Sequence, residues 1–308
     1  MAQADEVTHR ARAHDEVAVT LERERSRRAE DGAPGNPEIG TWLDAGGIRT
    51  NVHVRGAGAP VLLLHGSGPG VSAWANWRVT IPKLEQHFRV MAPDIVGFGY
   101  TERPAGTTYD VATWRQHLEA VVDAAGLEQF SIVGNSFGGA LALAYTIANP
   151  ARVRRLVLMG SAGAEFTLTE GLDAVWGYEP SLAAMRALLD IFAYDRSLVS
   201  DGLAKLRFEA SVRPGVQEAY SAMFPAPRRR WIEALQVPLE ELRRLAQPTL
   251  VVHGREDAVI PLQASLALFD AIPDAQLHVF GRCGHWIQIE HADRFARLVI
   301  DFLQEGAR

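Results

Sequence analysis

Short apolar runs that alternate with longer helical stretches constrain the fold of this chain more than any other feature. From Val61 onward, runs rich in Val, Leu and Ile recur between stretches with helical periodicity. Parallel strands are buried on both faces and need long crossovers, so the alternation predicts an α/β sandwich with a mostly parallel sheet. The expected strands are residues 61–64, 89–92, 130–133, 155–159, 249–253 and 276–280. The expected helices are residues 74–86, 111–125, 138–149, 262–271 and 292–303.

The interval 164–245 departs from this alternation. Its apolar residues recur at helical spacing, as in Met185, Leu188, Leu189 and Phe192, and no convincing strand interrupts them. We expect a helical cap that covers the active face and excludes water. The alternative is an additional structural layer of helices.

The organisation along the chain predicts three parts. Residues 1–40 are rich in Glu, Arg and Ala and end in a Gly- and Pro-rich breaker cluster, so we expect a charged N-terminal extension. It is interpreted as a solvated, partly helical tail, with an oligomerisation arm as the alternative. Residues 41–163 and 246–308 form the expected core, and residues 164–245 the expected cap.

Composition narrows the class of partner. A formal net charge of -6 argues against a broad nucleic-acid footprint, which needs clustered Lys and Arg. No run of about 18 apolar residues predicts a membrane span, and no H-E-x-x-H or paired cysteines predict a metal site. The single cysteine, Cys283, and the lack of an apolar export region at the amino terminus predict a cytoplasmic location. We therefore expect a small-molecule partner, no metal and no cofactor, and a homo-oligomer whose size the sequence does not indicate.

The pentapeptide from Gly134 to Gly138 predicts a nucleophile elbow. It follows an expected strand and precedes an expected helix, which is the context that a strained strand-to-helix turn requires. Its glycines leave room for the turn and expose the hydroxyl of Ser136 at the helix amino terminus. The alternative for the isolated motif is a structural glycine-rich turn.

A serine hydroxyl needs a base, and the expected chain order in this context is serine, acid, histidine. His285 follows the last expected strand, in a glycine-containing loop. Asp257 follows the strand 249–253 and is the expected acid that orients His285, with Glu256 and Asp94 as alternatives. Cys283 is not expected to be the nucleophile, because Ser136 already occupies the elbow.

The oxyanion of an acyl-transfer intermediate needs backbone donors. We expect the N–H of Phe137, directly after the nucleophile, and the N–H of Ser67, in the loop of small residues that follows the strand 61–64. A phosphate-binding role for this loop is disfavoured, since no Lys-Ser or Lys-Thr pair follows it.

From about Gly46 to Leu303 the chain resembles a known family in segments of both the core and the cap: HGSGPGVSAWANW, DIVGFGYTERP, VGNSFGG, VLMGSAG, TEGLDAVWGY, LLDIFAYDRSLV, LRFEAS, MFPAPR, HGRED and GRCGHWIQIEHADRF. These segments resemble the meta-cleavage product hydrolases, the C–C bond hydrolases of bacterial aromatic degradation, and most of all the 2-hydroxymuconate semialdehyde hydrolases. The resemblance implies the α/β-hydrolase fold, with a mostly parallel sheet flanked by helices and a helical cap inserted after the sixth strand.

The resemblance also implies site residues and a reaction. Arg207 corresponds to a cap arginine that holds the substrate carboxylate, and further substrate contacts are implied for Asn76, Asn135, Gly68 and Trp286. The implied reaction hydrolyses 2-hydroxy-6-oxohexa-2,4-dienoate to 2-hydroxypenta-2,4-dienoate and formate, or releases acetate from a 6-methyl substrate. Alternatives are a hydrolase for 6-aryl substrates, a carboxylesterase on the same fold, and a non-catalytic binding protein.

Overall fold

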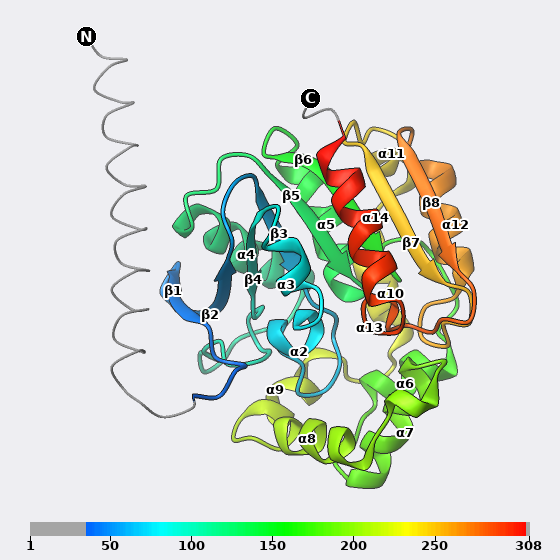
Figure 1. The fold of residues 1–308 in the computed structure, drawn as a ribbon. Coiled ribbons are helices and arrows are strands. Elements are labelled where there is room, and N and C mark those ends of the chain that lie inside the picture. The colour runs from blue at the N-terminus through cyan, green and yellow to red at the C-terminus, as the bar shows by residue number, and fades with distance from the viewer. Residues whose placement is uncertain (1–34, 306–308) are drawn as a thin grey trace.

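The computed structural model describes residues 35–305, and a single eight-stranded sheet forms the centre of this part of the chain (Figure 1). The strand order is β1-β2-β4-β3-β5-β6-β7-β8. The hairpin β1-β2 and the β2-β4 pair are antiparallel, and every other pair is parallel. The strands are β1 (Thr41–Ala45), β2 (Ile48–Arg55), β3 (Pro60–Leu64), β4 (Arg89–Pro93), β5 (Phe130–Asn135), β6 (Val153–Met159), β7 (Thr249–Gly254) and β8 (Ala275–Phe280).

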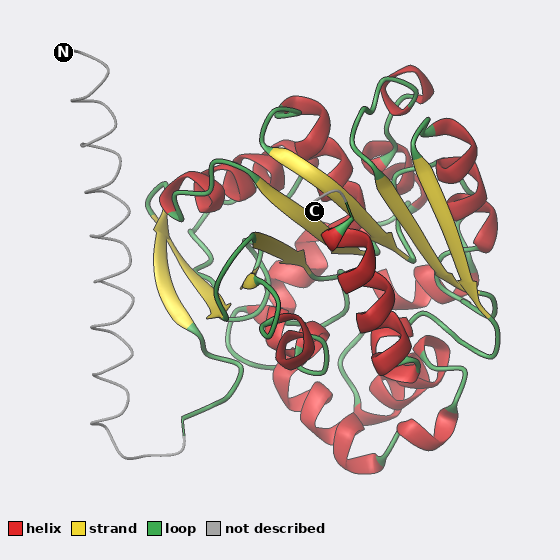
Figure 2. Ribbon diagram, turned by 45° about the horizontal axis from the view of Figure 1, so that its top comes forward, coloured by secondary structure: helices red, strands yellow, loops and turns green. Residues whose placement is uncertain are grey.

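Helices cover both faces of the sheet, as Figure 2 shows. Side chains of β3 alternate between two buried clusters, with Leu62 and Leu64 in one and Val61 and Leu63 in the other, as the two-residue period of a strand requires. The first cluster includes α4 (Val111–Ala124), α5 (Phe137–Ala148) and α12 (Leu262–Ala271). The second includes α2 (Ala73–Trp77), α3 (Ile81–Leu84), α13 (Ile287–Glu290) and α14 (Ala292–Gln304).

The chain between β6 and β7 is helical. Its elements are α6 (Glu170–Trp176), α7 (Leu182–Phe192), the 3-10 turn η1 (Arg196–Leu198), α8 (Asp201–Ser211), α9 (Val216–Met223), α10 (Arg229–Leu235) and α11 (Leu239–Leu242). Thr169, Ser181 and Ser200 cap α6, α7 and α8 by accepting a backbone N–H in the first turn. Helices α6 to α9 lie together beyond the carboxyl ends of the parallel strands (Figure 1), whereas α10 contacts α5 and α11 contacts α12. In the described part of the chain, no helix is long and apolar enough to cross a membrane.

The predicted α/β-hydrolase fold is confirmed, and all six expected strands are present. The sequence prediction missed the hairpin β1-β2, because β2 buries polar residues such as Asn51 and His53 that do not read as an apolar run. The expected helix 74–86 is wrong as a single element. It divides into α2 and α3, and Pro82, which lacks an N–H, lies at the start of the second helix.

The predicted boundary of the N-terminal extension at residue 40 needs correction. Residues 1–34 lie outside the described residues, but residues 35–40 belong to the packed structure. Glu38 is only 8% exposed, and its carbonyl accepts hydrogen bonds from Asn51 Nδ2 and His53 Nε2. A Cβ added to Gly40 would lie 2.1 Å from the carbonyl oxygen of Val52, so the segment contacts β2 closely. The folded region therefore begins before the first strand.

Replacing Gly138 by Ala should destabilise the junction of α5 and β3. An added Cβ would lie 2.5 Å from the Leu64 carbonyl oxygen, and only backbone movement would relieve the overlap. We expect the free energy of unfolding to fall by about 1 to 3 kcal/mol, measured by urea denaturation. Gly202→Ala, in the exposed first turn of α8, is the matched control and should be neutral or slightly stabilising. An equal loss in both variants would contradict the close-approach argument.

Candidate active site

Ser136 occupies the turn between β5 and α5. Its backbone has φ 55° and ψ −118°, a conformation that residues other than glycine rarely adopt. The turn is held by the Ser136 N–H, which donates to the carbonyl of Met159 in β6 at 2.9 Å. A Cβ added to Gly134 would lie 2.5 Å from the Gly138 carbonyl oxygen, so the sharp turn needs glycine on both sides of the serine. The expected elbow geometry is therefore present at Ser136.

His285 and Asp257 meet at the carboxyl edge of the sheet. The ring Nδ1 of His285 lies 2.7 Å from Asp257 Oδ2, and the other carboxylate oxygen accepts from the N–H groups of Val259 and Ile260 at 2.7 and 3.0 Å. The His285 N–H donates to the carbonyl of Phe192, the last residue of α7, at 2.8 Å. Donation from Nδ1 to the carboxylate leaves Nε2 as the proton acceptor, which is the tautomer a general base needs.

Ser136 and His285 line the same cavity, together with residues from α7 and α8. No hydrogen bond joins the serine hydroxyl to the imidazole among the described residues. Contacts of this kind often tighten only when substrate binds. The structure therefore brings Ser136 and a His285 ring bound to Asp257 to the same cavity.

The alternative acids do not contact His285. Glu256 accepts from the Cys283 N–H at 2.9 Å and pairs with Arg255. Asp94 is buried near α2 and accepts from the Ala73 N–H at 2.6 Å. Burial raises the pKa of Asp94 to about 6. The same cause raises the pKa of the Cys283 thiol, which keeps it from acting as a thiolate nucleophile at neutral pH.

The N–H groups of Phe137 and Ser67 are the oxyanion donors expected from the sequence. Phe137 begins α5, so its N–H has no intrahelical acceptor, and Ser67 lines the cavity. Among the described residues, neither N–H has a hydrogen-bond acceptor. The Ser67 loop is fixed on its other side, because Trp176 Nε1 donates to the Ser67 hydroxyl at 3.0 Å and the Tyr220 hydroxyl donates to the Ser67 carbonyl at 3.0 Å.

The predicted substrate contacts lie around the same cavity. Gly68, Asn76, Asn135 and Trp286 all line it. Asn76 Oδ1 accepts from the Gly66 N–H at 3.2 Å, while its buried Nδ2 has no partner in the described structure. Asn135 Nδ2 donates to the carbonyl of Met159, and Trp286 stacks on Phe192 with ring centroids 5.3 Å apart.

Arg207 also lines the cavity, but its guanidinium is already bound by protein groups. Nη1 lies 3.0 Å from Glu38 Oε1, and Nη2 donates to the carbonyl of Gly70. The sequence prediction missed Glu38, the partner of Arg207, and it missed two residues that line the cavity, Arg78 and Gln288. Gln288 is 1% exposed, and its Oε1 has no partner in the described structure. Arg78 lies two positions after Asn76 in the sequence. This proximity to a predicted site residue is the signal that could have identified Arg78 as a cavity residue.

Comparison with known protein families identifies the fold class of this chain. The model of the alpha/beta hydrolase fold family matches residues 59–292, which is more than half of the chain. The elbow at Ser136 and the sheet topology agree with this class.

Similarity to individual proteins identifies the family within this fold class. The chain is 62% identical over 275 residues to a 2-hydroxymuconate semialdehyde hydrolase of Pseudomonas sp. (strain CF600), covering 89% of this chain and 97% of the relative. It is 60% identical to a 2-hydroxy-6-oxo-2,4-heptadienoate hydrolase of Pseudomonas putida, covering 87% and 97%. A solved serine-to-alanine variant of the meta-cleavage product hydrolase CumD from Pseudomonas fluorescens IP01, complexed with acetates, has a TM-score of 0.87 and 57% identity, covering 88% of this chain and all of the other. The chain belongs to the meta-cleavage product hydrolases of the α/β-hydrolase fold.

Two buried neutral histidines support the loops around the site. His65 Nε2 accepts from the Ile95 N–H at 3.0 Å, and His117 Nδ1 accepts from the Val96 N–H at 3.2 Å. Burial lowers the pKa of each ring to about 4. Protonation of either ring would remove the acceptor of a buried backbone N–H, so both rings must stay neutral in the folded protein.

His117→Gln should make stability less sensitive to acid. The folded-state pKa of about 4 lies below the ordinary value of 6.5, so the unfolded chain binds this proton first. The contribution of His117 is therefore complete above about pH 6.5 and is lost as the pH falls toward 4. Between pH 6.5 and 4.5 the free energy of unfolding should decline less steeply in the variant, by roughly 1 kcal/mol per pH unit, in urea titrations.

The raised pKa of Asp94 acts in the opposite direction in part of this interval, but it is present in both proteins and does not alter their difference. Parallel stability curves for the variant and the wild type would show that His117 does not titrate as argued.

Proposed function

We propose that this chain is a serine-dependent C–C bond hydrolase that acts on 2-hydroxy-6-oxohexa-2,4-dienoate, which is 2-hydroxymuconate semialdehyde, or on its 6-methyl analogue. The products are 2-hydroxypenta-2,4-dienoate and formate, or acetate for the methyl substrate. The observation that carries the proposal is one cavity lined by Ser136, by His285 bound to Asp257, and by arginines at the same site. The names of the two relatives with 62% and 60% identity support the substrate class.

The chemistry needs an electron sink before the C5–C6 bond breaks. We assign proton delivery to C5 to His285, which converts the dienol to its keto tautomer. Ser136, or a water activated by His285, then attacks the C6 carbonyl, and the N–H groups of Ser67 and Phe137 stabilise the oxyanion. When the C5–C6 bond breaks, its electron pair is delocalised into the C2 carbonyl, and the resulting dienolate takes up a proton on the C2 oxygen to give 2-hydroxypenta-2,4-dienoate. C6 leaves as the carboxylate after one water has been consumed. No step of this scheme requires a cofactor.

Part of the cavity wall is apolar. Leu172, Val175, Met185, Leu189 and Val259 contribute it, mostly from α6 and α7. An apolar wall suits the C6 end of the substrate, because a hydrogen or methyl substituent has no polar group to solvate. The name of the relative at 60% identity, which ends in heptadienoate, supports a methyl group as an acceptable substituent. The homo-oligomeric state and the cytoplasmic location stay predictions from the sequence.

Ser136→Ala should lower turnover of the semialdehyde by several orders of magnitude, because nucleophile and base act as a unit. The loss of the yellow dienolate absorbance measures turnover directly. Ser131→Ala, at a buried serine on β5, the strand that ends just before Ser136, is the matched control and should turn over substrate like the wild type. A Ser136→Ala enzyme with near-normal turnover would remove Ser136 from its proposed role.

The ring-fission products of catechol, 3-methylcatechol and 2,3-dihydroxybiphenyl distinguish the possible C6 substituents. We expect the first two products to be hydrolysed with a far higher kcat/KM than the third. The loss of the dienolate absorbance measures all three rates. An enzyme that hydrolyses p-nitrophenyl acetate but leaves all three ring-fission products intact would be a carboxylesterase instead. Preference for the biphenyl product would assign the chain to 6-aryl substrates.

A further inference from the structure

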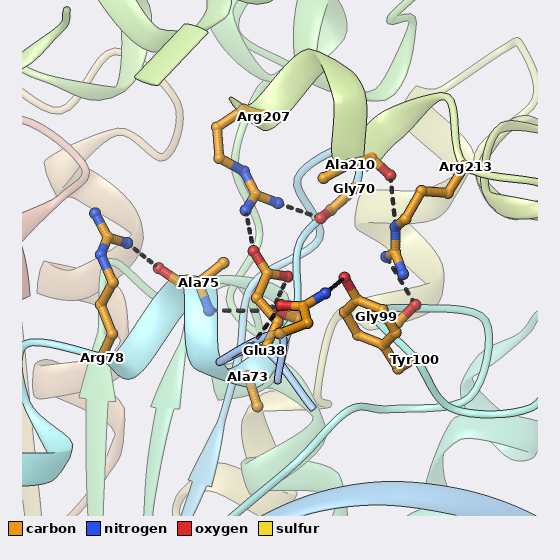
Figure 3. Close-up of polar contacts among 12 residues, drawn as sticks. Glu38, Gly70, Ala73, Ala75, Arg78, Gly99, Tyr100, Arg207, Ala210 and Arg213 are labelled. Carbon is orange, nitrogen blue, oxygen red and sulfur yellow. Dashed lines mark hydrogen bonds and ion pairs between the residues drawn. The ribbon is translucent and has the colours of Figure 1, made fainter. Parts of the chain in front are cut away.

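Three charged side chains gather at one side of the cavity. Glu38 precedes β1, Arg78 follows α2, and Arg207 lies on α8 (Figure 3). Arg78 and Arg207 line the cavity. Burial, and then the nearby positive charge of Arg207, lower the pKa of Arg78, while the negative charge of Glu38 raises it. Glu38 forms an ion pair with Arg207, while Arg78 lines the same cavity as Arg207, so the three side chains together carry one net positive charge.

Glu38 is a fixed point in this cluster. Its N–H donates to Asn36 Oδ1 at 3.0 Å, and its carbonyl accepts from Asn51 and His53 on β2. Its carboxylate accepts from the Ser72 hydroxyl at 2.8 Å through Oε2 and from Arg207 through Oε1. The Glu38 side chain is 11% exposed, and each of its carboxylate oxygens accepts a hydrogen bond from a group of the protein.

Arg207 connects α8 to the core through this carboxylate. Its side chain is 10% exposed, and its second terminal nitrogen donates to the carbonyl of Gly70. Gly70 itself closely approaches α8, because an added Cβ would lie 2.6 Å from the Ser211 nitrogen. The positive charge of Arg207 is thus largely balanced by a carboxylate that is buried beside it.

Arg78 is bound differently. Figure 3 shows Arg207 directed at Glu38 and Gly70, whereas Arg78 lies apart from this pair. The contact of Arg78 is a hydrogen bond from Nη1 to the carbonyl of Ala75, at 2.7 Å. No carboxylate within residues 35–305 forms an ion pair with Arg78, so its charge is available to an anion in the cavity.

We propose that Glu38 is a positioning and specificity-determining residue, which holds Arg207 in place and cancels one arginine charge, so that Arg78 supplies the net positive charge that the substrate carboxylate meets. This inference rests on the proposed function, because the proposed substrate supplies the carboxylate that Arg78 would meet. The amide nitrogen Nδ2 of Asn76, which is buried and has no partner in the described structure, belongs to a second residue that lines the cavity and adds a neutral donor.

The experiment compares inhibition by two small anions of different charge, butyrate as the monoanion and malonate as the dianion. Their competitive inhibition is measured against hydrolysis of the neutral ester p-nitrophenyl acetate, in the full-length protein. Arg78→Gln should weaken inhibition by both anions and raise KM for the semialdehyde about tenfold or more, with a much smaller change in kcat. Glu38→Gln should strengthen inhibition by malonate more than inhibition by butyrate, because the three positions then carry two positive charges.

The double variant Glu38→Gln with Arg78→Gln restores one net charge and should return the malonate-to-butyrate ratio toward that of the wild type. If Glu38 had only a structural role, Glu38→Gln would instead weaken inhibition by both anions equally. The double variant would then not restore the malonate-to-butyrate ratio. Glu119→Gln, on α4 and paired with Arg115, removes a more exposed acid and should leave the ratio unchanged.

The two proposals can fail separately. A wild-type protein that hydrolyses the ester but not the semialdehyde contradicts the proposed function, while the anion ratios still test the cluster. Unchanged anion inhibition in Arg78→Gln overturns the further inference, even if the semialdehyde is turned over. If Glu38→Gln does not accumulate as folded protein, Arg78→Gln alone decides the result, since its inhibition by both anions must weaken.

Discussion

The close approach of α5 to the ends of β3 and β5 is the constraint on which the site depends. Only glycine fits at Gly134 and Gly138, because any Cβ there would overlap a backbone carbonyl or its neighbours. This contact forces the positive φ of Ser136 and brings the first N–H of α5 beside the loop that carries Ser67. The backbone positions of Ser136 and Phe137 are therefore set by the packing of α5 against the sheet.

Hydrogen bonds and an ion pair hold the helical segment between β6 and β7 against the rest of the protein. The carbonyl of Phe192 accepts from the His285 N–H, Trp176 donates to the Ser67 hydroxyl, and Arg207 binds both Glu38 and the Gly70 carbonyl. Each contact joins a helix of this segment to a loop of the active site. Buried polar contacts are geometrically specific, since a shifted helix would leave unpaired groups in a dry environment. The position of the helices, the orientation of the base and the charge of the pocket are consequently coupled.

The reliability of the sequence predictions followed from how local each signal was. The parallel strands and the elbow were predictable, because a buried strand carries its own apolar run and the turn carries its own glycines. The hairpin β1-β2 was missed, since Asn51 and His53 are buried by hydrogen bonds to Asp94 and to the carbonyl of Glu38 rather than by apolar packing. Those partners lie far along the chain or in a segment without periodicity.

The sequence by itself determined the fold class, the strand-to-helix turn at Ser136 and the chain order of serine, acid and histidine, because each is recorded by local patterns: apolar runs, the glycines of the turn, and single residues that directly follow an expected strand. Only the tertiary structure decided that Asp257 rather than Glu256 or Asp94 contacts His285, and that Glu38 holds Arg207 across 169 positions of sequence. The physical reason is the range of the interaction. An ion pair depends on distance in space, and no local pattern records which distant carboxylate will lie beside which cation.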